Sequence, residues 1–131
     1  MPTDRTLAIL DASALLAFLF DEPGADRAAD VLSRAAISTI NWAEVVQRVI
    51  ARGGNATPAR DDLLDAGLEF VPVSIGDAEL AAVWQAPTRP LGLSLADRAC
   101  LALAHRTRLP ALTADRSWID VDLGVDIELI R

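Results

Sequence analysis

The sequence predicts an α/β fold in which helices cover both faces of a parallel sheet. Short apolar runs alternate along the chain with longer segments whose apolar residues recur at helical spacing. This alternation is typical of parallel strands, because each helix returns the chain to the same end of the sheet. The chain has 131 residues, 52% of them hydrophobic, which is enough for one buried core, so we expect one domain over residues 1–131.

The first half of the chain is expected to hold two strands and four helices. Residues 7–10 and 36–39 are short apolar runs typical of buried strands. The expected helices span residues 12–20, 26–34, 41–52 and 57–67. Glu22-Pro23-Gly24 and Gly53-Gly54 end two of them, and Thr57-Pro58 has the order of a cap followed by proline.

The second half continues the alternation. Strands are expected at residues 69–73, 111–113 and 127–130, and helices at residues 76–85 and 94–106. Residues 87–92 are rich in proline and are expected to form a loop, and Trp118 is expected in a helical turn. No repeat, low-complexity tract or linker interrupts this order.

Composition limits the compartment and the partners. The longest apolar stretch, residues 14–20, is far shorter than the roughly 18 residues of a membrane span, and no signal peptide is apparent. A single cysteine, Cys100, fits a reducing compartment, so we expect a soluble cytoplasmic protein. The net charge of −7 disfavours a nucleic acid as a partner, but all 12 basic residues are arginine, which binds phosphate well.

Four acidic residues stand near the predicted ends of strands or the starts of helices. Asp11 and Asp115 each follow a strand candidate, and Glu44 lies one helical turn past a third strand candidate. Asp97 lies at the start of a helix, and that helix leads into the strand before Asp115. The ends of parallel strands meet at one edge of a sheet, where ligands bind in this architecture. Asp97 joins the other three only if the start of its helix folds back to that edge.

Each acid also has an ordinary structural explanation. Asp11 is a suitable helix cap, and Asp115 suits a turn. Asn41-Trp42-Ala43-Glu44 and Ser94-Leu95-Ala96-Asp97 both have the form of a capping box. If the four acids meet, however, two carboxylates about 5 Å apart repel by roughly 3 kcal/mol at an effective dielectric of 20. An all-carboxylate site of this kind favours Mg²⁺ or Mn²⁺, and hydrolysis of a phosphodiester is the chemistry that follows.

The segments around these acids resemble signature segments of PIN domains, and in particular VapC toxins of bacterial toxin–antitoxin pairs. The resemblance extends from about Leu7 to Trp118, and its most distinctive part is Gly92-Leu93-Ser94-Leu95-Ala96-Asp97-Arg98-Ala99. The other segments are Leu10-Asp11-Ala12-Ser13-Ala14, Glu22-Pro23-Gly24, residues 38–44 and Thr113-Ala114-Asp115-Arg116.

The resemblance implies a central parallel sheet of about five strands and a Mg²⁺- or Mn²⁺-dependent endoribonuclease that acts on structured RNA such as tRNA. It also implies a homodimer and a VapB-type antitoxin that covers the active site. By resemblance, the metal-binding and catalytic residues are Asp11, Glu44, Asp97 and Asp115. Asp115 falls on the most variable position, and Asp120 and Asp122 are alternatives to it.

Other residues receive secondary roles. The hydroxyls of Ser13 and Thr113 match family positions and are expected to bond a ligand carboxylate or a metal-bound water. Arg98 and Arg116 adjoin proposed ligands and are candidates for contact with RNA phosphate, although ion pairs with those acids are an equal alternative. His105 suits the end of its helix better than a catalytic relay, and Trp42, Trp84 and Trp118 suit packing better than base stacking.

Several other functions are excluded or left open. Haloacid-dehalogenase phosphatases and receiver domains also place an aspartate after the first strand, but both depend on lysine, which this chain lacks. Neither a P-loop nor a G-x-G-x-x-G motif is present. A PIN nuclease of general RNA processing, and an idle protein that binds antitoxin or RNA without cleavage, remain alternatives.

Overall fold

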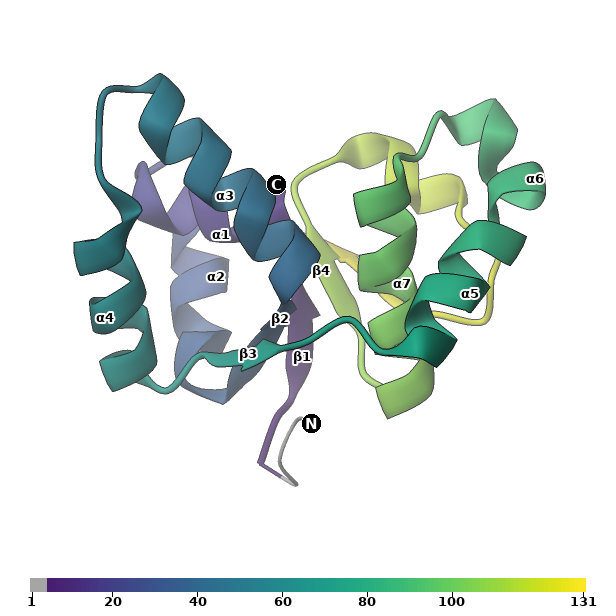
Figure 1. Ribbon diagram of the computed structural model, residues 1–131, viewed down its shortest axis with the longest axis horizontal. Coiled ribbons are helices and arrows are strands. Elements are labelled where there is room, and N and C mark those ends of the chain that lie inside the picture. Colours follow the sequence, from purple (N-terminus) through teal and green to yellow (C-terminus); the bar gives the residue numbers. More distant parts are fainter. Residues whose placement is uncertain (1–4) are drawn as a thin grey trace.

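A five-stranded parallel sheet forms the centre of the protein, in a computed structural model that describes residues 5–131 (Figure 1). The strands are β1 (Ala8–Leu10), β2 (Ala35–Ser38), β3 (Glu69–Val71), β4 (Ala111–Thr113) and β5 (Ile127–Leu129). Their order across the sheet is β3-β2-β1-β4-β5, and every neighbouring pair is parallel. The predicted fold class is therefore confirmed.

Helices cover both faces of this sheet, and Figure 1 shows the two groups on either side of the strands. One group consists of α1 (Ala12–Leu19), α2 (Ala25–Val31), α3 (Thr39–Ala51) and α4 (Ala56–Ala66). The other consists of α5 (Ile75–Val83), α6 (Gln85–Thr88) and α7 (Leu95–Thr107). Short 3-10 turns η1 (Leu32–Arg34), η2 (Arg89–Leu91) and η3 (Arg116–Asp120) complete the elements.

Two hydrophobic cores result from the alternation of side chains along the central strands. Leu10, Ile37 and Leu112 pack with the α1–α4 group. Ile9 and the neighbouring alanines of β2 and β4 pack instead against α7. Because β1 is covered on both faces, all three of its residues are buried, as expected for an inner strand of a parallel sheet.

Local capping differs from the sequence prediction at two helices. The first residue of α3 is Thr39, and Ser38 caps it by accepting a hydrogen bond from the backbone N–H of Ile40. The predicted capping box of Asn41 and Glu44 is therefore wrong, because Asn41 already lies inside the helix. Asn55, not Thr57, caps α4, and its side chain accepts from the Thr57 N–H at 3.0 Å.

The proline-rich segment 87–92 is the main error among the predicted elements. It was expected to be a loop, but it forms the end of α6 and the turn η2. Pro87 and Pro90 fall in the first turn of these short helices, where the missing backbone N–H would have no helical partner. Proline therefore does not disrupt either helix.

The chain reverses its direction of progress across the sheet between β1 and β4. From β1 the order runs through β2 to β3 on one side, and through β4 to β5 on the other. A crevice is expected at the carboxyl ends of strands at such a switch point. No helix within residues 5–131 is long and apolar enough to cross a membrane.

Candidate acidic active site

A cavity of about 250 Å³ opens at the edge of the sheet where β1 and β4 end. All four predicted acids line it, and they come from four different parts of the chain. The lining residues are Asp11, Ala12, Ser13, Leu16, Glu44, Gln47, Arg48, Asp97 and Asp115. The start of α7 therefore does reach the edge where β1 and β4 end, as the grouping of Asp97 with the other acids required.

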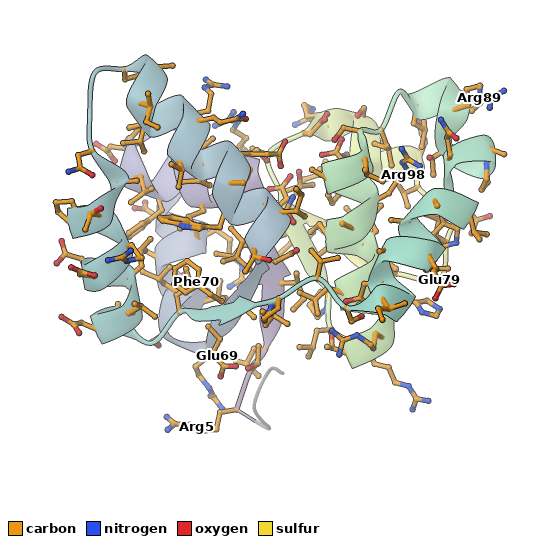
Figure 2. All side chains as sticks on the ribbon, in the orientation of Figure 1. Arg5, Glu69, Phe70, Glu79, Arg89 and Arg98 are labelled. Atoms are coloured by element: carbon orange, nitrogen blue, oxygen red, sulfur yellow. The ribbon has the colours of Figure 1, made fainter. Side chains whose placement is uncertain are left out.

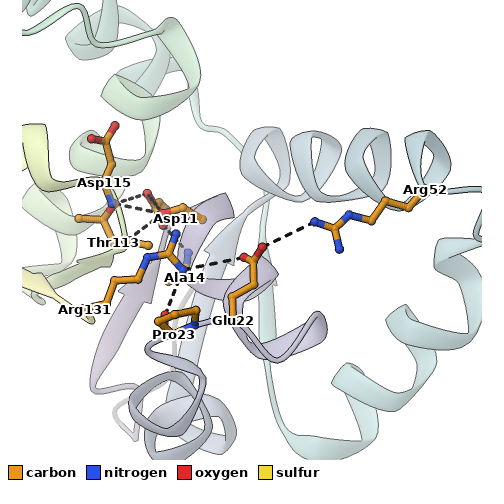
Figure 3. Close-up of polar contacts among 10 residues, drawn as sticks. Asp11, Ala14, Glu22, Pro23, Arg52, Thr113, Asp115 and Arg131 are labelled. Carbon is orange, nitrogen blue, oxygen red and sulfur yellow. Dashed lines mark hydrogen bonds and ion pairs between the residues drawn. The ribbon is translucent and has the colours of Figure 1, made fainter.

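Asp11 is the most deeply placed acid, with 3% of its surface exposed. Ser13 donates a hydrogen bond to its carboxylate at 2.7 Å, and the backbone N–H of Ala14 donates another at 2.8 Å. The hydroxyl of Thr113 donates to the second oxygen and accepts from the backbone N–H of Asp115 at 3.0 Å (Figure 3). These bonds join the ends of β1 and β4 and fix the orientation of the Asp11 side chain.

Burial and repulsion shift the pKa values of Asp11, Glu44 and Asp97 upward. The pKa of Asp11 rises to about 6, mainly because burial disfavours its charge, and the nearby charge of Asp97 adds to the effect. The hydrogen bonds from Thr113, Ala14 and Ser13 act in the opposite direction but are outweighed. The pKa values of Glu44 and Asp97 are raised too, again mainly by burial.

Asn41 holds Glu44 in place, a role that the sequence analysis missed. Its side chain is fully buried, and its amide nitrogen donates to Glu44 Oε1 and to the backbone carbonyl of Ala96, both at 3.1 Å. Ala96 directly precedes Asp97, so one amide group ties α3 to the start of α7. The position of Asn41 one turn before Glu44 was the available signal, but it was interpreted as a cap.

The ordinary explanations hold for three of the four acids. Asp11 caps α1, Asp115 caps η3, and Asp97 forms a capping box with Ser94. Glu44 caps nothing and accepts from Asn41 instead. Capping therefore does not distinguish these acids from other helix-start residues, whereas their convergence on one cavity does.

The arginines next to the ligand candidates have other partners. Arg98 is buried, and its guanidinium donates to the backbone carbonyl of Ala81 in α5 at 2.8 Å (Figure 2). Arg116 is exposed and donates to the carbonyl of Arg131 at 2.9 Å. Neither side chain lines the acidic cavity, and contact between either one and RNA stays a prediction.

The remaining candidates lie outside the cavity. Asp120 and Asp122 are exposed and do not line it, so the geometry favours Asp115 as the fourth acid. His105 packs edge-on against Trp84, with ring centroids 5.6 Å apart, and Cys100 of α7 is buried in the core. Trp118 is fully buried and Trp42 packs against Phe70, in keeping with packing roles for the aromatic residues.

The side chains of the cavity offer the type of ligand atom that a hard divalent cation prefers. Every acidic group at the cavity offers oxygen, and neither histidine nor cysteine lines it. Within residues 5–131, no three acidic, histidine or cysteine side chains already converge as closely as the ligands of one ion. Within that part of the chain, the buried Oδ1 of Asn41, the residue that bonds Glu44, has no hydrogen-bond partner.

The sequence profile of the PIN domain matches residues 8–123. The chain belongs to the PIN-domain family. This match includes strands β1 to β4 and all four acids of the cavity. No curated protein matches this PIN domain in sequence.

Solved structures share the fold at low sequence identity. A toxin–antitoxin complex from Klebsiella pneumoniae aligns with a TM-score of 0.70 at 21% identity, covering 95% of this chain and 98% of that one. VapC20 from Mycobacterium tuberculosis, described as a toxin that cleaves the sarcin–ricin loop, aligns with a TM-score of 0.72 at 16% identity. The alignment covers 91% of this chain and 98% of that one. VapBC2 from Rickettsia felis, bound to a DNA fragment from its promoter, aligns with a TM-score of 0.70 at 14% identity. The alignment covers 95% of this chain and 98% of that one.

Proposed function

We propose that this PIN domain is a Mg²⁺- or Mn²⁺-dependent endoribonuclease that hydrolyses phosphodiester bonds in structured RNA. The observation that carries the proposal is the convergence of Asp11, Glu44, Asp97 and Asp115 on one cavity at the switch point of the sheet. Four carboxylates around one cavity form a strongly negative site, and a divalent cation would neutralise part of that charge.

Each acid would serve as a metal ligand, and the surrounding residues would fix the ligands. Ser13 and Thr113 orient the carboxylate of Asp11, and Asn41 orients that of Glu44. A divalent ion bound there supplies polarisation of a phosphoryl oxygen, a more acidic water and stabilisation of the leaving oxygen. The protein contributes the position and the negative charge of the ligands, together with a partly buried environment.

The attacking group is proposed to be water, not a side chain. Ser13 lines the cavity with its hydroxyl beside Asp11, but that hydroxyl already donates to Asp11 and accepts from the backbone N–H of Ala114 at 2.8 Å. His105 does not line the cavity and is not placed to act as a general base for Ser13. No covalent enzyme intermediate is therefore expected.

The biological setting that fits this nuclease best is a toxin–antitoxin pair. Structural neighbours include VapBC complexes, in two cases bound to DNA, and a toxin described as cleaving the sarcin–ricin loop. We therefore propose a VapC-type toxin with a VapB-type antitoxin as its partner, a homodimeric state, and tRNA or another structured RNA as substrate.

The test is cleavage of total tRNA and ribosomal RNA by the purified protein in Mg²⁺, in Mn²⁺ and in EDTA. Asp97→Asn removes a charge from the cavity, and Asp120→Asn is the matched control because Asp120 is an exposed acid outside it. We expect discrete fragments with the wild type and with Asp120→Asn. Loss of a metal ligand should reduce the rate of Asp97→Asn at least 100-fold, the order of loss seen for one key electrostatic group.

Three results would contradict the proposal. Cleavage that persists in EDTA would exclude the metal mechanism. Equal activity of Asp97→Asn and Asp120→Asn would show that the acidic cavity is not the active site. If the wild type neither cleaves RNA nor binds Mn²⁺, the idle binding protein replaces the nuclease.

A further inference from the structure

The wall of the acidic cavity formed by α3 carries one basic residue, Arg48. Gln47 and Arg48 line the cavity beyond Glu44, and Arg48 is its only lining cation among the described residues 5–131. Residues four apart share a face of a helix, so Arg48 stands one turn along from Glu44 and faces the same space. The sequence analysis did not single it out.

Arg48 differs from most other arginines because its charge is not used within the protein. Across residues 5–131 its exposed side chain takes part in no ion pair, and its guanidinium donates no hydrogen bond to the chain. A pair with Glu44 would be the expected contact at this spacing, yet Glu44 bonds to Asn41 instead. Five other arginines do pair with acids, namely Arg27 with Glu128, Arg52 and Arg131 with Glu22, Arg60 with Asp61 and Arg106 with Asp77.

We infer that Arg48 binds the RNA backbone, contacting a phosphate next to the one that is cleaved. The inference rests on the proposed nuclease function and adds a substrate-binding residue to it. An RNA strand that enters the cavity must bring its neighbouring phosphates past four carboxylates. Arg48 is the cavity-lining group that offers those phosphates an attractive contact, and its planar fork suits phosphate oxygens.

The experiment compares Arg48→Gln with Arg89→Gln on the same RNA panel, total tRNA and ribosomal RNA. Glutamine keeps a good helix former at position 48 and removes one charge. Arg89 is also exposed and lies at the far end of the α6 side of the molecule (Figure 2), so its substitution changes net charge equally but away from the cavity. Rates at several RNA and salt concentrations give kcat, KM and the salt dependence of kcat/KM.

We expect Arg48→Gln to lower kcat/KM about tenfold, mostly through KM, since a charge-assisted hydrogen bond is lost. The slope of log(kcat/KM) against log salt should become shallower by about 0.7 to 0.9, which corresponds to one phosphate contact. Arg48→Lys should recover part of the loss, because it restores the charge without the fork. Mn²⁺ affinity should stay equal or become tighter, which separates substrate binding from metal binding.

The outcomes distinguish this inference from the function on which it rests. If Arg48→Gln matches Arg89→Gln in KM and in salt slope while the wild type cleaves RNA, the inference is wrong and the nuclease stands. If Arg48→Gln loses kcat and Mn²⁺ affinity instead, Arg48 supports the metal site and the inference is also wrong. A wild type that neither binds nor cleaves RNA overturns both.

Discussion

The side chain of Asp11 is subject to two opposing influences. Hydrogen bonds from Ser13, Ala14 and Thr113 favour its ionised form, and burial favours its protonated form. Burial has the larger effect and raises the pKa of Asp11 to about 6, so the folded protein carries a disfavoured charge at pH 7. A buried carboxylate that is oriented by hydrogen bonds is suited to binding a cation. Without a cation, its charge makes the folded protein less stable.

This balance predicts that the metal-free protein loses stability as the pH rises from about 4 to 6. In that range the unfolded chain has released the Asp11 proton while the folded protein still holds it, so deprotonation favours unfolding. A pKa raised from 3.8 to about 6 corresponds to a loss of about 3 kcal/mol. The raised pKa values of Glu44 and Asp97 act in the same direction.

Urea unfolding in EDTA at several pH values measures the effect, with Asp11→Asn as the test variant. At pH 7 the neutral amide should stabilise the fold by about 1–3 kcal/mol, and the stability should depend less on pH. Asp120→Asn, which removes an exposed charge, should change neither quantity by more than about 0.5 kcal/mol. Equal pH profiles for Asp11→Asn and wild type would show that Asp11 is not the group responsible.

Among the elements, α3 and α7 provide Glu44 and Asp97, and Asn41 is the hydrogen-bonded link between them. We predict that Asn41→Ala lowers the free energy of unfolding by about 1–3 kcal/mol, because the buried Asn41 amide and its hydrogen bond to the Ala96 carbonyl are lost. It should also weaken Mn²⁺ binding, because Glu44 loses the donor that orients it. Calorimetric titration with Mn²⁺ measures this second effect.

A purely structural role for Asn41 requires its own control. Thr88 is also buried and donates one hydrogen bond, to the Trp84 carbonyl at 2.7 Å, but it does not line the cavity. Thr88→Ala should therefore lower stability without lowering Mn²⁺ affinity. If Asn41→Ala and Thr88→Ala retain the same affinity, Asn41 stabilises the fold and does not position Glu44.

The elements themselves were largely predictable, because their signals are local. Hydrophobic spacing identified all five strands, and the capping box at Ser94 and Asp97 is present as predicted. The proline-rich segment 87–92 was missed, because proline in the first turn of a helix leaves the same sequence signature as proline in a loop.

The contacts of the site were harder to predict, because they join residues far apart in sequence. The bond from Asn41 to the Ala96 carbonyl spans 55 positions, and the burial of Arg98 against α5 depends on how two helices pack. The grouping of Asp11 with Asp115 follows from parallel strands alone. The grouping of Asp97 with these acids required the assumption that the start of α7 lies at the same edge of the sheet. The hydrophobic periodicity of α7 carries no information about that position.

At the scale of the whole molecule, the acidic cavity accounts for much of the net charge. The chain carries −7, and without the four cavity acids 15 acidic residues face 12 arginines, which leaves −3. An acidic protein can therefore still approach RNA once its cavity is neutralised, with arginines outside or at the edge of the cavity available to phosphate. Four of the charges that disfavour RNA therefore lie where a cation is expected.

The acids come from both helical layers and from the strands between them, so a bound cation should stabilise the whole fold. We predict that Mn²⁺ at about 100 times its Kd stabilises the protein by about 2.7 kcal/mol, since the unfolded chain lacks the assembled site. For a domain of this size that corresponds to a rise in Tm of about 10 °C, measured by differential scanning calorimetry at pH 7.5. The rise should shrink at pH 5.5, where protons compete for Asp11.

Two single substitutions separate this effect from weak binding to surface acids. Asp115→Asn should lose most of the rise in Tm, because Asp115 lines the cavity, whereas Asp122→Asn should keep it, because Asp122 is exposed outside the cavity. The reverse result would make Asp122 the fourth ligand. Equal rises in both variants and the wild type would mean that the ion binds elsewhere on this acidic protein, and the four-acid site would then lose its role as a metal centre.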